Sequence, residues 1–411
     1  MTAVLRHREL RALLLATLVS TAGDQLARVA LTVLVYDRTG SALLSGAVYA
    51  STFLPALVGA PLLGGLADRR PRRQVMIRAD LLRAGLLCLL ALPGVPIPVA
   101  LGLVVVVTLV ECPFDAARAA LLPSVDEGLY LQALALDRAV QQSAQVVGFA
   151  TGGLVLTLLD PSAALLLDAL TFALSALLLA ARVRPRAAAE IAAPRPLRST
   201  VVADLRTAWR TVLADPLTRR PVLYVWLACA VACVPEGLAA PYAAGLGGGA
   251  ATVALLMAAN PVGNTVSGLL LARTRSSLHP RLLGPLALLV SVPLALCLLR
   301  PGVPELVLLV VLSGAGMALS VLARAQFVVR VPDPERGRAF ALAAAGITVA
   351  QGLAVAVSAA VAEVVPPAVV VGVAGVLGVV AVVLMRLTHP VPAGAARSLD
   401  VAVAVPQPVE V

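Results

Sequence analysis

Long hydrophobic runs recur along the whole chain, and glycine, proline and arginine interrupt them at short intervals. Each run is close to or above the length of about 20 apolar residues that crosses the hydrocarbon core of a bilayer. The pattern therefore predicts twelve transmembrane helices and no β-sheet. The twelve predicted helices cover residues 10–36, 43–65, 74–94, 98–121, 134–158, 162–182, 222–243, 250–272, 282–300, 304–324, 339–363 and 367–386.

Composition supports lipid as the solvent of this chain. Hydrophobic residues make up 60% of the sequence and charged residues 13%, against roughly 45–50% and about 25% in soluble domains. A water-soluble fold of 411 residues could not cover that much apolar surface. The first run, 10–36, is also longer than the roughly 7–15 apolar residues of a cleaved signal peptide. We expect a multi-pass integral membrane protein.

The formal net charge is +10, but its distribution does not fit nucleic-acid binding. The basic residues gather at the ends of apolar runs and not along one helix face. Aromatic residues are only 3% of the chain, too few for base-stacking platforms. We therefore expect no nucleic-acid partner.

Arginine placement predicts how the helices are oriented. The loops rich in arginine alternate with loops that are nearly free of it, and such loops face the cytoplasm. An even number of spans with both termini in the cytoplasm fits this alternation, and the cell membrane is the expected location. The arginine-rich segments are residues 6–11, 69–73, 182–220, 273–281 and 330–338.

A polar stretch near the middle of the chain suggests a boundary between two halves. Within it, residues 197–213 place apolar side chains at helical spacing, which indicates an amphipathic helix on the membrane surface. The predicted organisation is a six-helix bundle at 1–182, a cytoplasmic linker with an amphipathic helix at 183–220, a second six-helix bundle at 221–387, and a flexible tail at 388–411.

An internal repeat supports the two halves. Identical residues recur at one offset: Pro55 and Pro261 (261 − 55 = 206), Arg118 and Arg324 (324 − 118 = 206), and Gln145 and Gln351 (351 − 145 = 206). Two related bundles around a central cavity are the usual origin of such a repeat in a transporter. The predicted fold is therefore all-α, with twelve helices in two pseudo-symmetric six-helix bundles.

Residues 64–73, Gly-Gly-Leu-Ala-Asp-Arg-Arg-Pro-Arg-Arg, resemble the loop between the second and third helices of major facilitator transporters. Pro71 stands where the family usually has glycine. The stretches 23–41 and 167–172 resemble the drug-efflux branch, in particular macrolide and siderophore exporters. Residues 148–153 resemble its antiporter motif, with Phe149 in place of proline. The resemblance implies alternating access, with the first and fourth helices lining the cavity.

The resemblance also implies a cytoplasmic gate latch. Its expected members are Gly64, Asp68, Arg69, Arg72, Arg73 and Asp115. Asp68 would cap a helix N-terminus, where an anion is favoured, and one of the last two arginines would pair with Asp115. The alternative for the individual arginines is simple anchoring at the cytoplasmic membrane surface.

Carboxylates inside a bilayer are costly and are therefore candidates for function. Asp24, Glu111 and Glu236 are the expected proton or substrate ligands, with Gln145 and Asn260 as uncharged partners. Each has a structural alternative. Asp24 could pair with a residue one turn on, Glu111 could make a structural hydrogen bond, and amides often hold helices together.

Two further carboxylates favour a structural role. We expect Asp168, near the outer face, to form an ion pair with Arg28, which is also the residue one turn after Asp24. Asp80 and Arg83 lie three residues apart near the cytoplasmic end of the third helix, and we expect them to be structural as well.

These features predict a secondary transporter, most readily a proton-coupled exporter of a hydrophobic or amphipathic small molecule such as a drug, macrolide or siderophore. Uptake of a small metabolite by the same fold is the alternative. An importer would usually have a more polar or cationic cavity, whereas aliphatic residues dominate this sequence.

Other functional classes find less support in the sequence. The sequence shows neither the catalytic set that a membrane-embedded enzyme would need nor the soluble domain that would support a non-transporting receptor. There is no Walker-type loop for ATP, and Cys229 and Cys233 have no companion ligands for a metal. We expect no enzyme activity, no cofactor and no metal. The small-molecule substrate, a proton and the lipid bilayer are the expected partners of a monomer.

Overall fold

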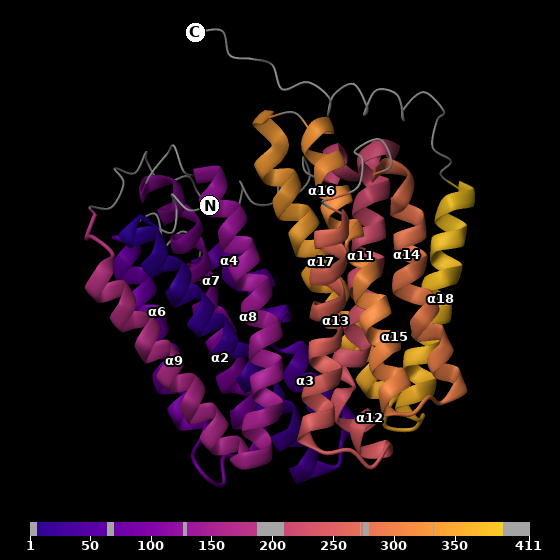
Figure 1. Ribbon diagram of the computed structural model, residues 1–411, viewed down its shortest axis with the longest axis horizontal. Coiled ribbons are helices and arrows are strands. Elements are labelled where there is room, and N and C mark those ends of the chain that lie inside the picture. Colours follow the sequence, from indigo (N-terminus) through magenta and orange to yellow (C-terminus); the bar gives the residue numbers. More distant parts are fainter. Residues whose placement is uncertain are drawn as a thin grey trace, which may run out of the picture. The chain divides into compact units, whose positions relative to one another are not determined.

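The computed structural model describes residues 6–63, 70–125, 130–186, 209–271, 273, 279–331 and 333–388, and these residues are overwhelmingly helical (Figure 1). Nine helices among them are long and apolar enough to cross a membrane, and a bent pair of helices adds a tenth. Two further long helices, α6 and α8, carry more polar residues and bring the helical segments to the twelve that the sequence predicts. The all-α membrane fold is confirmed.

The first half of the chain contains seven described helices. They are α2 (Arg8–Thr39), α3 (Ala42–Ala50), α4 (Leu54–Leu63), α6 (Arg72–Leu90), α7 (Ile97–Val125), α8 (Tyr130–Leu158) and α9 (Pro161–Arg182). Gly40 ends α2 in the left-handed conformation that glycine adopts without strain. The Asp160 carboxylate caps the N-terminus of α9 by accepting the Ala163 N–H at 3.3 Å.

One predicted helix, 43–65, is broken in the structure. Residues 51–53 form a turn between α3 and α4. The hydroxyls of Ser51 and Thr52 donate to the carbonyls of Val48 and Tyr49 at 2.7 and 2.8 Å. Such local bonds compete with the helical pattern, and Pro55 lacks the N–H that would continue it.

The second half follows the same order of helices. It contains a π-helical turn (Arg210–Ala214), α11 (Pro216–Gly237), α12 (Ala239–Gly245), α13 (Ala250–Leu271), α14 (His279–Ala295), a 3-10 turn (Leu296–Leu299), α15 (Val303–Gly316), α16 (Leu319–Arg330), α17 (Asp333–Val361) and α18 (Pro367–Thr388). The axes of α11 and α12 differ by 50°. Pro235 and Gly237, which precede this bend, are the residue types that kink helices.

Several helix boundaries repeat at the offset found in the sequence. The starts of α7 and α15 differ by 303 − 97 = 206 residues, and those of α9 and α18 by 367 − 161 = 206. The ends of α9 and α18 also differ by 388 − 182 = 206. The repeat in sequence is therefore a repeat of helices, as the two pseudo-symmetric bundles require.

By packing, the chain divides into two compact units. Unit 1 comprises residues 1–194, 236–261 and 355–367, and unit 2 comprises 195–235, 262–354 and 368–411. Unit 1 thus includes α12 and the first half of α13 in addition to the first six predicted helices. Most of the predicted amphipathic helix, 197–208, and the tail beyond residue 388 lie outside the described residues. The described residues resume at Trp209, which is exposed, and Val212 three residues later is buried.

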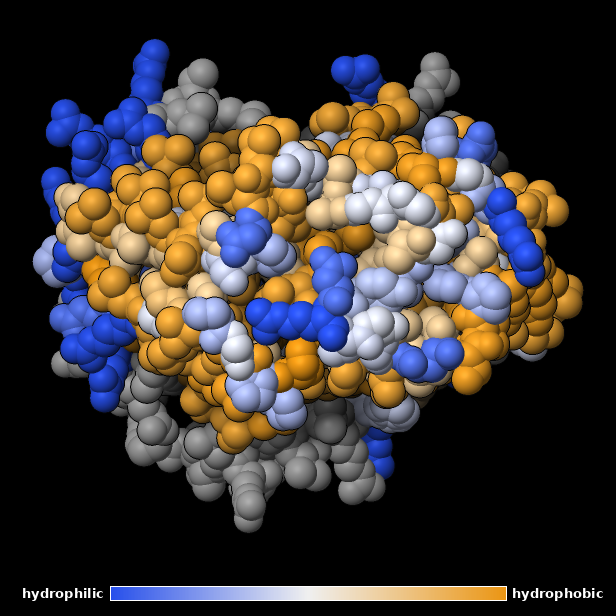
Figure 2. Space-filling model, turned by 90° about the horizontal axis from the view of Figure 1, so that it is seen from below, coloured by the Kyte–Doolittle hydropathy of each residue, from blue (hydrophilic) through white to orange (hydrophobic). Residues whose placement is uncertain are grey.

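The surface of the helices is strongly hydrophobic, as expected for contact with lipid. Leu170 and Leu177 of α9 expose 63% and 64% of their surface. Seen from below, orange hydrophobic residues dominate the molecular face, and blue and white polar residues gather in patches among them (Figure 2). Inside unit 1, the core consists of aliphatic residues and Phe114 and Phe172, contributed by α2, α6, α7 and α9.

Candidate functional site

Unit 1 contains a polar cavity of about 330 Å³, which we call the charged cavity. Its walls come from α2, α7 and α8, with one residue from α6. Four predicted site residues line it together: Asp24, Glu111, Asp115 and Gln145. The other lining residues are Thr17, Ser20, Thr21, Gln25, Arg28, Arg83, Phe114, Arg118, Arg138, Gln141 and Gln142.

The lining of the charged cavity corrects the expectation of an aliphatic pocket. Four arginines contribute to it: Arg28, Arg83, Arg118 and Arg138. Each comes from a different helix, α2, α6, α7 or α8, so no basic run in the sequence reveals the group. The cavity can therefore receive a polar or charged part of a substrate, with both acidic and basic side chains at hand.

Asp24 pairs with Arg83 of α6 and not with the residue one turn along its own helix. Both carboxylate oxygens accept from Arg83 Nη2, at 2.8 and 2.9 Å. Arg28 instead donates to Gln25 Oε1 at 3.4 Å. The Asp24–Arg28 ion pair, which the sequence offered as an alternative, is absent from the described residues. The Asp24 carboxylate is bound by the Arg83 guanidinium of α6 instead.

Arg83 is a candidate site residue that the sequence analysis treated as structural. Its side chain is almost completely buried, and the guanidinium lies 4.0 Å from the centre of the Phe172 ring. Asp80 Oδ1 is 4.0 Å from Arg83 Nη1, and Asp80 Oδ2 accepts from the Ser175 hydroxyl at 2.6 Å. An arginine within a predicted membrane helix is itself a signal of function, and that signal could have identified Arg83.

The predicted ion pair between Arg28 and Asp168 is wrong. Asp168 Oδ1 accepts from the Thr171 hydroxyl at 2.9 Å, and among the described residues the carboxylate has no cation within 4.0 Å. Its side chain faces Gly23, where a Cβ atom would collide with Asp168 and Thr171. Asp168 also lines a small cavity of about 40 Å³. That cavity shares Asp24, Arg28 and Glu111 with the charged cavity.

The predicted pairing of Asp115 in the gate latch is also different in the structure. Arg72 Nη1 donates to the Ala120 carbonyl at 2.7 Å, and Arg73 donates to the carbonyls of Leu179 and Ala180 at 3.2 and 2.5 Å. The Arg73 acceptors lie in the last turn of α9, where helix carbonyls lack intrahelical partners and attract cations.

Asp115 has a partner on its own helix instead. Arg118 Nη2 lies 3.1 Å from Asp115, and Arg118 Nη1 lies 3.0 Å from the buried Asp137. Gln141 donates to Asp137 at 2.6 Å. A partner three residues away on one helix face needs no other helix to approach. The remaining latch residues, Gly64, Asp68 and Arg69, lie outside the described residues.

Glu236 and Asn260 do not line the charged cavity. Glu236, at the end of α11, accepts a hydrogen bond from the buried Tyr49 hydroxyl of α3. Asn260 of α13 exposes 8% of its surface. Their predicted substrate role stays a prediction.

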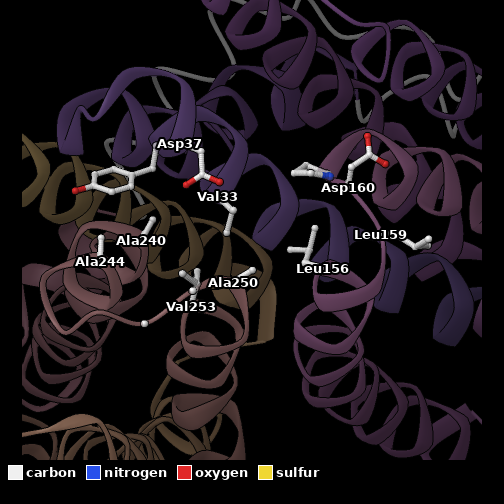
Figure 3. Close-up of a pocket in the computed structure, with 13 residues that line it drawn as sticks. Val33, Asp37, Leu156, Leu159, Asp160, Ala240, Ala244, Ala250 and Val253 are labelled. Atoms are coloured by element: carbon white, nitrogen blue, oxygen red, sulfur yellow. The ribbon is translucent and has the colours of Figure 1, made fainter.

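A second pocket of unit 1 lies at the opposite end of α2. It has a volume of about 250 Å³ and contains two carboxylates, Asp37 and Asp160. Figure 3 shows Val33 and Asp37 of α2 facing the small side chains of Ala240, Ala250 and Val253. None of the predicted site residues lines this pocket.

Unit 2 has a pocket of a different kind, which we call the aromatic pocket. It has a volume of about 110 Å³ and is lined by Trp226, Phe327 and Phe340, with mostly aliphatic neighbours and Arg324. Trp226 Nε1 donates to the Ala343 carbonyl at 2.9 Å, and the two phenylalanine rings meet edge to face at 5.0 Å. Among the described residues of the chain, no cluster of three or more metal-ligating side chains occurs.

Comparison with protein families gives a match along the whole membrane region. The model of the Major Facilitator Superfamily matches residues 13–240 and 237–409. No curated protein matches the chain.

Solved structures of transporters share the fold at low sequence identity. A POT family transporter in complex with a thioalcohol-conjugated peptide has a TM-score of 0.73 and 11% identity, over 93% of this chain and 96% of its own. A structure of proton-dependent oligopeptide transporters has a TM-score of 0.71 and 12% identity, over 95% and 99%. The nucleoside transporter NupG has 0.68 and 15%, over 94% and 99%.

Proposed function

Because the chain belongs to the major facilitator superfamily, we propose that it is a proton-coupled secondary transporter that exports a small amphipathic molecule across the cell membrane by alternating access. The carrying observation is the charged cavity, which contains both Asp24 and Glu111. Arg83 pairs with Asp24, whereas Glu111 has no ion pair within 4.0 Å among the described residues, so Glu111 can take up either a proton or a substrate cation. Binding one can therefore release the other, which is the requirement for antiport.

Each unit has a pocket with its own chemistry. In unit 1, the charged cavity offers Asp24 and Glu111 to a cationic group. In unit 2, the aromatic pocket offers Trp226, Phe327 and Phe340 to an apolar group. Buried aromatic side chains provide large apolar contact areas and attract cations over their faces. We place both termini and the arginine-rich loops in the cytoplasm, and we propose that the transporter works as a monomer.

Proton-coupled uptake is the second candidate. The four arginines of the charged cavity favour it, because guanidinium groups bind carboxylates and phosphates of polar nutrients. The names of two solved relatives, a proton-dependent oligopeptide transporter and a nucleoside transporter, agree with a polar substrate.

An efflux assay distinguishes the two directions. The chain is expressed in cells that lack their own efflux pumps and are loaded with a lipophilic cationic dye. We expect loss of dye that an uncoupler abolishes. Accumulation of a nutrient without dye loss would favour uptake, and absence of both would contradict proton-coupled transport of these substrates.

Two carboxylate variants test the coupling site. Glu111→Gln and Asp24→Asn should each lose the uncoupler-sensitive part of transport, because an amide takes up no proton. Glu305→Gln is the matched control, since Glu305 is an exposed carboxylate outside both pockets. Unchanged coupling in both cavity variants would remove these residues from the mechanism.

A further inference from the structure

We infer that Arg83 has two alternative carboxylate partners, and that Asp80 receives its guanidinium whenever Asp24 is neutralised by a proton or a substrate cation. The significance for transport rests on the proposed function above, whereas the exchange itself rests on the geometry of α2, α6 and α9. Asp80 would then be a positioning residue that acts on Asp24 through Arg83.

Arg83 and Asp80 each have one buried polar atom that lacks a hydrogen-bond partner. Arg83 Nε and Asp80 Oδ1 are both buried without one, and the residues expose 1% and 0% of their surface. Arg83 Nη1 lies 4.0 Å from Asp80 Oδ1. A charge-assisted hydrogen bond measures about 2.7–2.9 Å, so a movement of about 1 Å would form it. Buried polar groups normally have partners, and an arrangement in which Nη1 reaches Asp80 Oδ1 would give that oxygen one.

The surroundings hold Asp80 in place and present an aromatic face to the guanidinium. Ser175 donates to Asp80 Oδ2 at 2.6 Å, which fixes the carboxylate and directs Oδ1 toward Arg83. The guanidinium lies 4.0 Å from the centre of the Phe172 ring. A planar cation can shift across an aromatic face and keep its favourable contact with the ring. The ring therefore supports both positions of the guanidinium.

The other charged groups near Arg83 are less suited to this exchange. Glu111 of α7 and Asp168 of α9 interact with Arg83 through the field of their charges. Among the described residues, however, only Asp24 and Asp80 lie within 4.0 Å of it. One oxygen of Asp168 already accepts from Thr171. Arg28 of α2 is a cation and would repel the guanidinium.

The exchange removes an obstacle to binding at Asp24. If Asp24 became neutral and Arg83 had no other partner, a guanidinium would remain buried without a counter-charge, which is strongly unfavourable. With Asp80 beside it, the guanidinium stays paired in both states. Asp24 can therefore bind and release a proton or a cationic group inside the membrane.

A double-mutant cycle on purified protein in detergent tests the inference. Melting temperature and the monodisperse fraction are measured for Asp24→Asn, Asp80→Asn and the double variant. Each single variant should stay folded, because one carboxylate remains for Arg83. The melting temperature of the double variant should fall by far more than the sum of the two single decreases. Asp24→Asn with Glu305→Gln is the control, and its shifts should add, because Glu305 is exposed and lies outside this group of residues.

Rescue distinguishes the exchange from a merely structural role. Asp24→Asn combined with Asp80→Glu should stay folded, because a carboxylate is restored. Adding Arg83→Met to the double variant should recover most of the loss, because no cation is then left unpaired. A structure of the Asp24→Asn variant should show Arg83 hydrogen-bonded to Asp80 at about 2.9 Å.

Several results would overturn the inference. These are additive losses in the double variant, collapse of either single variant, or an Arg83–Asp80 separation that stays near 4.0 Å in Asp24→Asn. None of these measurements requires transport. A protein that moves no dye can therefore still pass this test, and a proven exporter can still fail it.

Discussion

Two equivalent pairs of helices, one in each half of the chain, are held together in different ways. In the first half, α6 and α9 meet through the Asp80–Ser175 hydrogen bond and the Arg83–Phe172 contact. In the second half, the helices at the 206-residue offset are α14 and α18. The four positions are occupied there by Leu286 (80 + 206), Leu289 (83 + 206), Gly378 (172 + 206) and Ala381 (175 + 206).

Close approach replaces the charges in the second half. Gly375 of α18 lies so near the backbone of Leu294 and Ala295 that a Cβ atom would collide with it, and Gly378 similarly faces Ser291. In lipid, either small residues or polar side chains can hold two helices together. The repeated fold therefore does not require the charged cluster of the first half, by which we mean Asp24, Asp80, Arg83, Glu111 and Asp168.

The contrast extends to the other members of the cluster. Asp24, Glu111 and Asp168 correspond to apolar residues in the second half. These are Ala230 (24 + 206), Met317 (111 + 206) and Ala374 (168 + 206). Buried charges are costly, so their concentration in one half indicates that they serve a task beyond packing. If the proposed proton coupling holds, this comparison places it in unit 1.

The largest expected effect comes from removing the buried cation. Arg83→Met should lower the free energy of unfolding by about 3–5 kcal/mol, because Asp24 and Asp80 lose their counter-charge. The repeat-related change Leu289→Met should cost less than about 1.5 kcal/mol, as volume-conserving apolar changes do. Chemical unfolding in detergent measures both. Equal losses of unfolding free energy would mean that the Arg83 side chain contributes only its packing volume and not its charge.

A smaller effect is expected from the glycine contact of the second half. Gly375→Ala should cost about 1–3 kcal/mol, because the new methyl group meets the backbone of Leu294 and Ala295. The related position in the first half is Ala169 (375 − 206), and Ala169→Gly should cost only about 0.5–1 kcal/mol. Thermal unfolding compares the two. A neutral Gly375→Ala would show that close approach does not stabilise this helix pair.

The smallest effect concerns a carboxylate outside the membrane spans. Glu363, after α17, accepts from the Ser41 hydroxyl at 2.7 Å and the Leu43 N–H at 2.6 Å. These bonds, led by the Leu43 N–H, hold the pKa of Glu363 below its usual value. The corresponding residue of the first half is Thr157 (363 − 206), which has no charge to titrate.

The depressed pKa gives this contact a defined pH dependence. Its stabilisation is fully present above the ordinary glutamate pKa of about 4.3 and is lost as the pH falls through the lower folded value. Melting temperatures of the parent protein and Glu363→Gln should therefore differ in their dependence on pH between about 3 and 5. Glu305→Gln serves as the control. If the melting temperatures of all three proteins changed with pH in the same way, the Glu363 contact would not contribute to the pH dependence of stability.

Much of the fold could be predicted from the sequence because the solvent is lipid. Every backbone group must find a partner within its own helix, so apolar length alone locates helices such as α9 and α18 to within a residue or two. The 206-residue offset likewise needs only the order of residues. Breaks were harder to locate. Proline and glycine are visible in the sequence before the bend after Pro235, but the turn at 51–53 depends on local hydroxyl bonds that hydropathy does not register.

The site was predicted only in part. The sequence identified Asp24 and Glu111, because a carboxylate within an apolar run is conspicuous anywhere it occurs. For Asp24 it offered only Arg28 as an ion-pair alternative, since spacing along one helix identifies only neighbours on that helix, and the structure pairs Asp24 with Arg83 instead. Which arginine reaches Asp24, whether Asp115 meets Arg72 or Arg118, and which two buried atoms remain unpaired depend on how α2, α6, α7 and α9 pack. Those choices are set by distances between helices, and only the tertiary structure contains them.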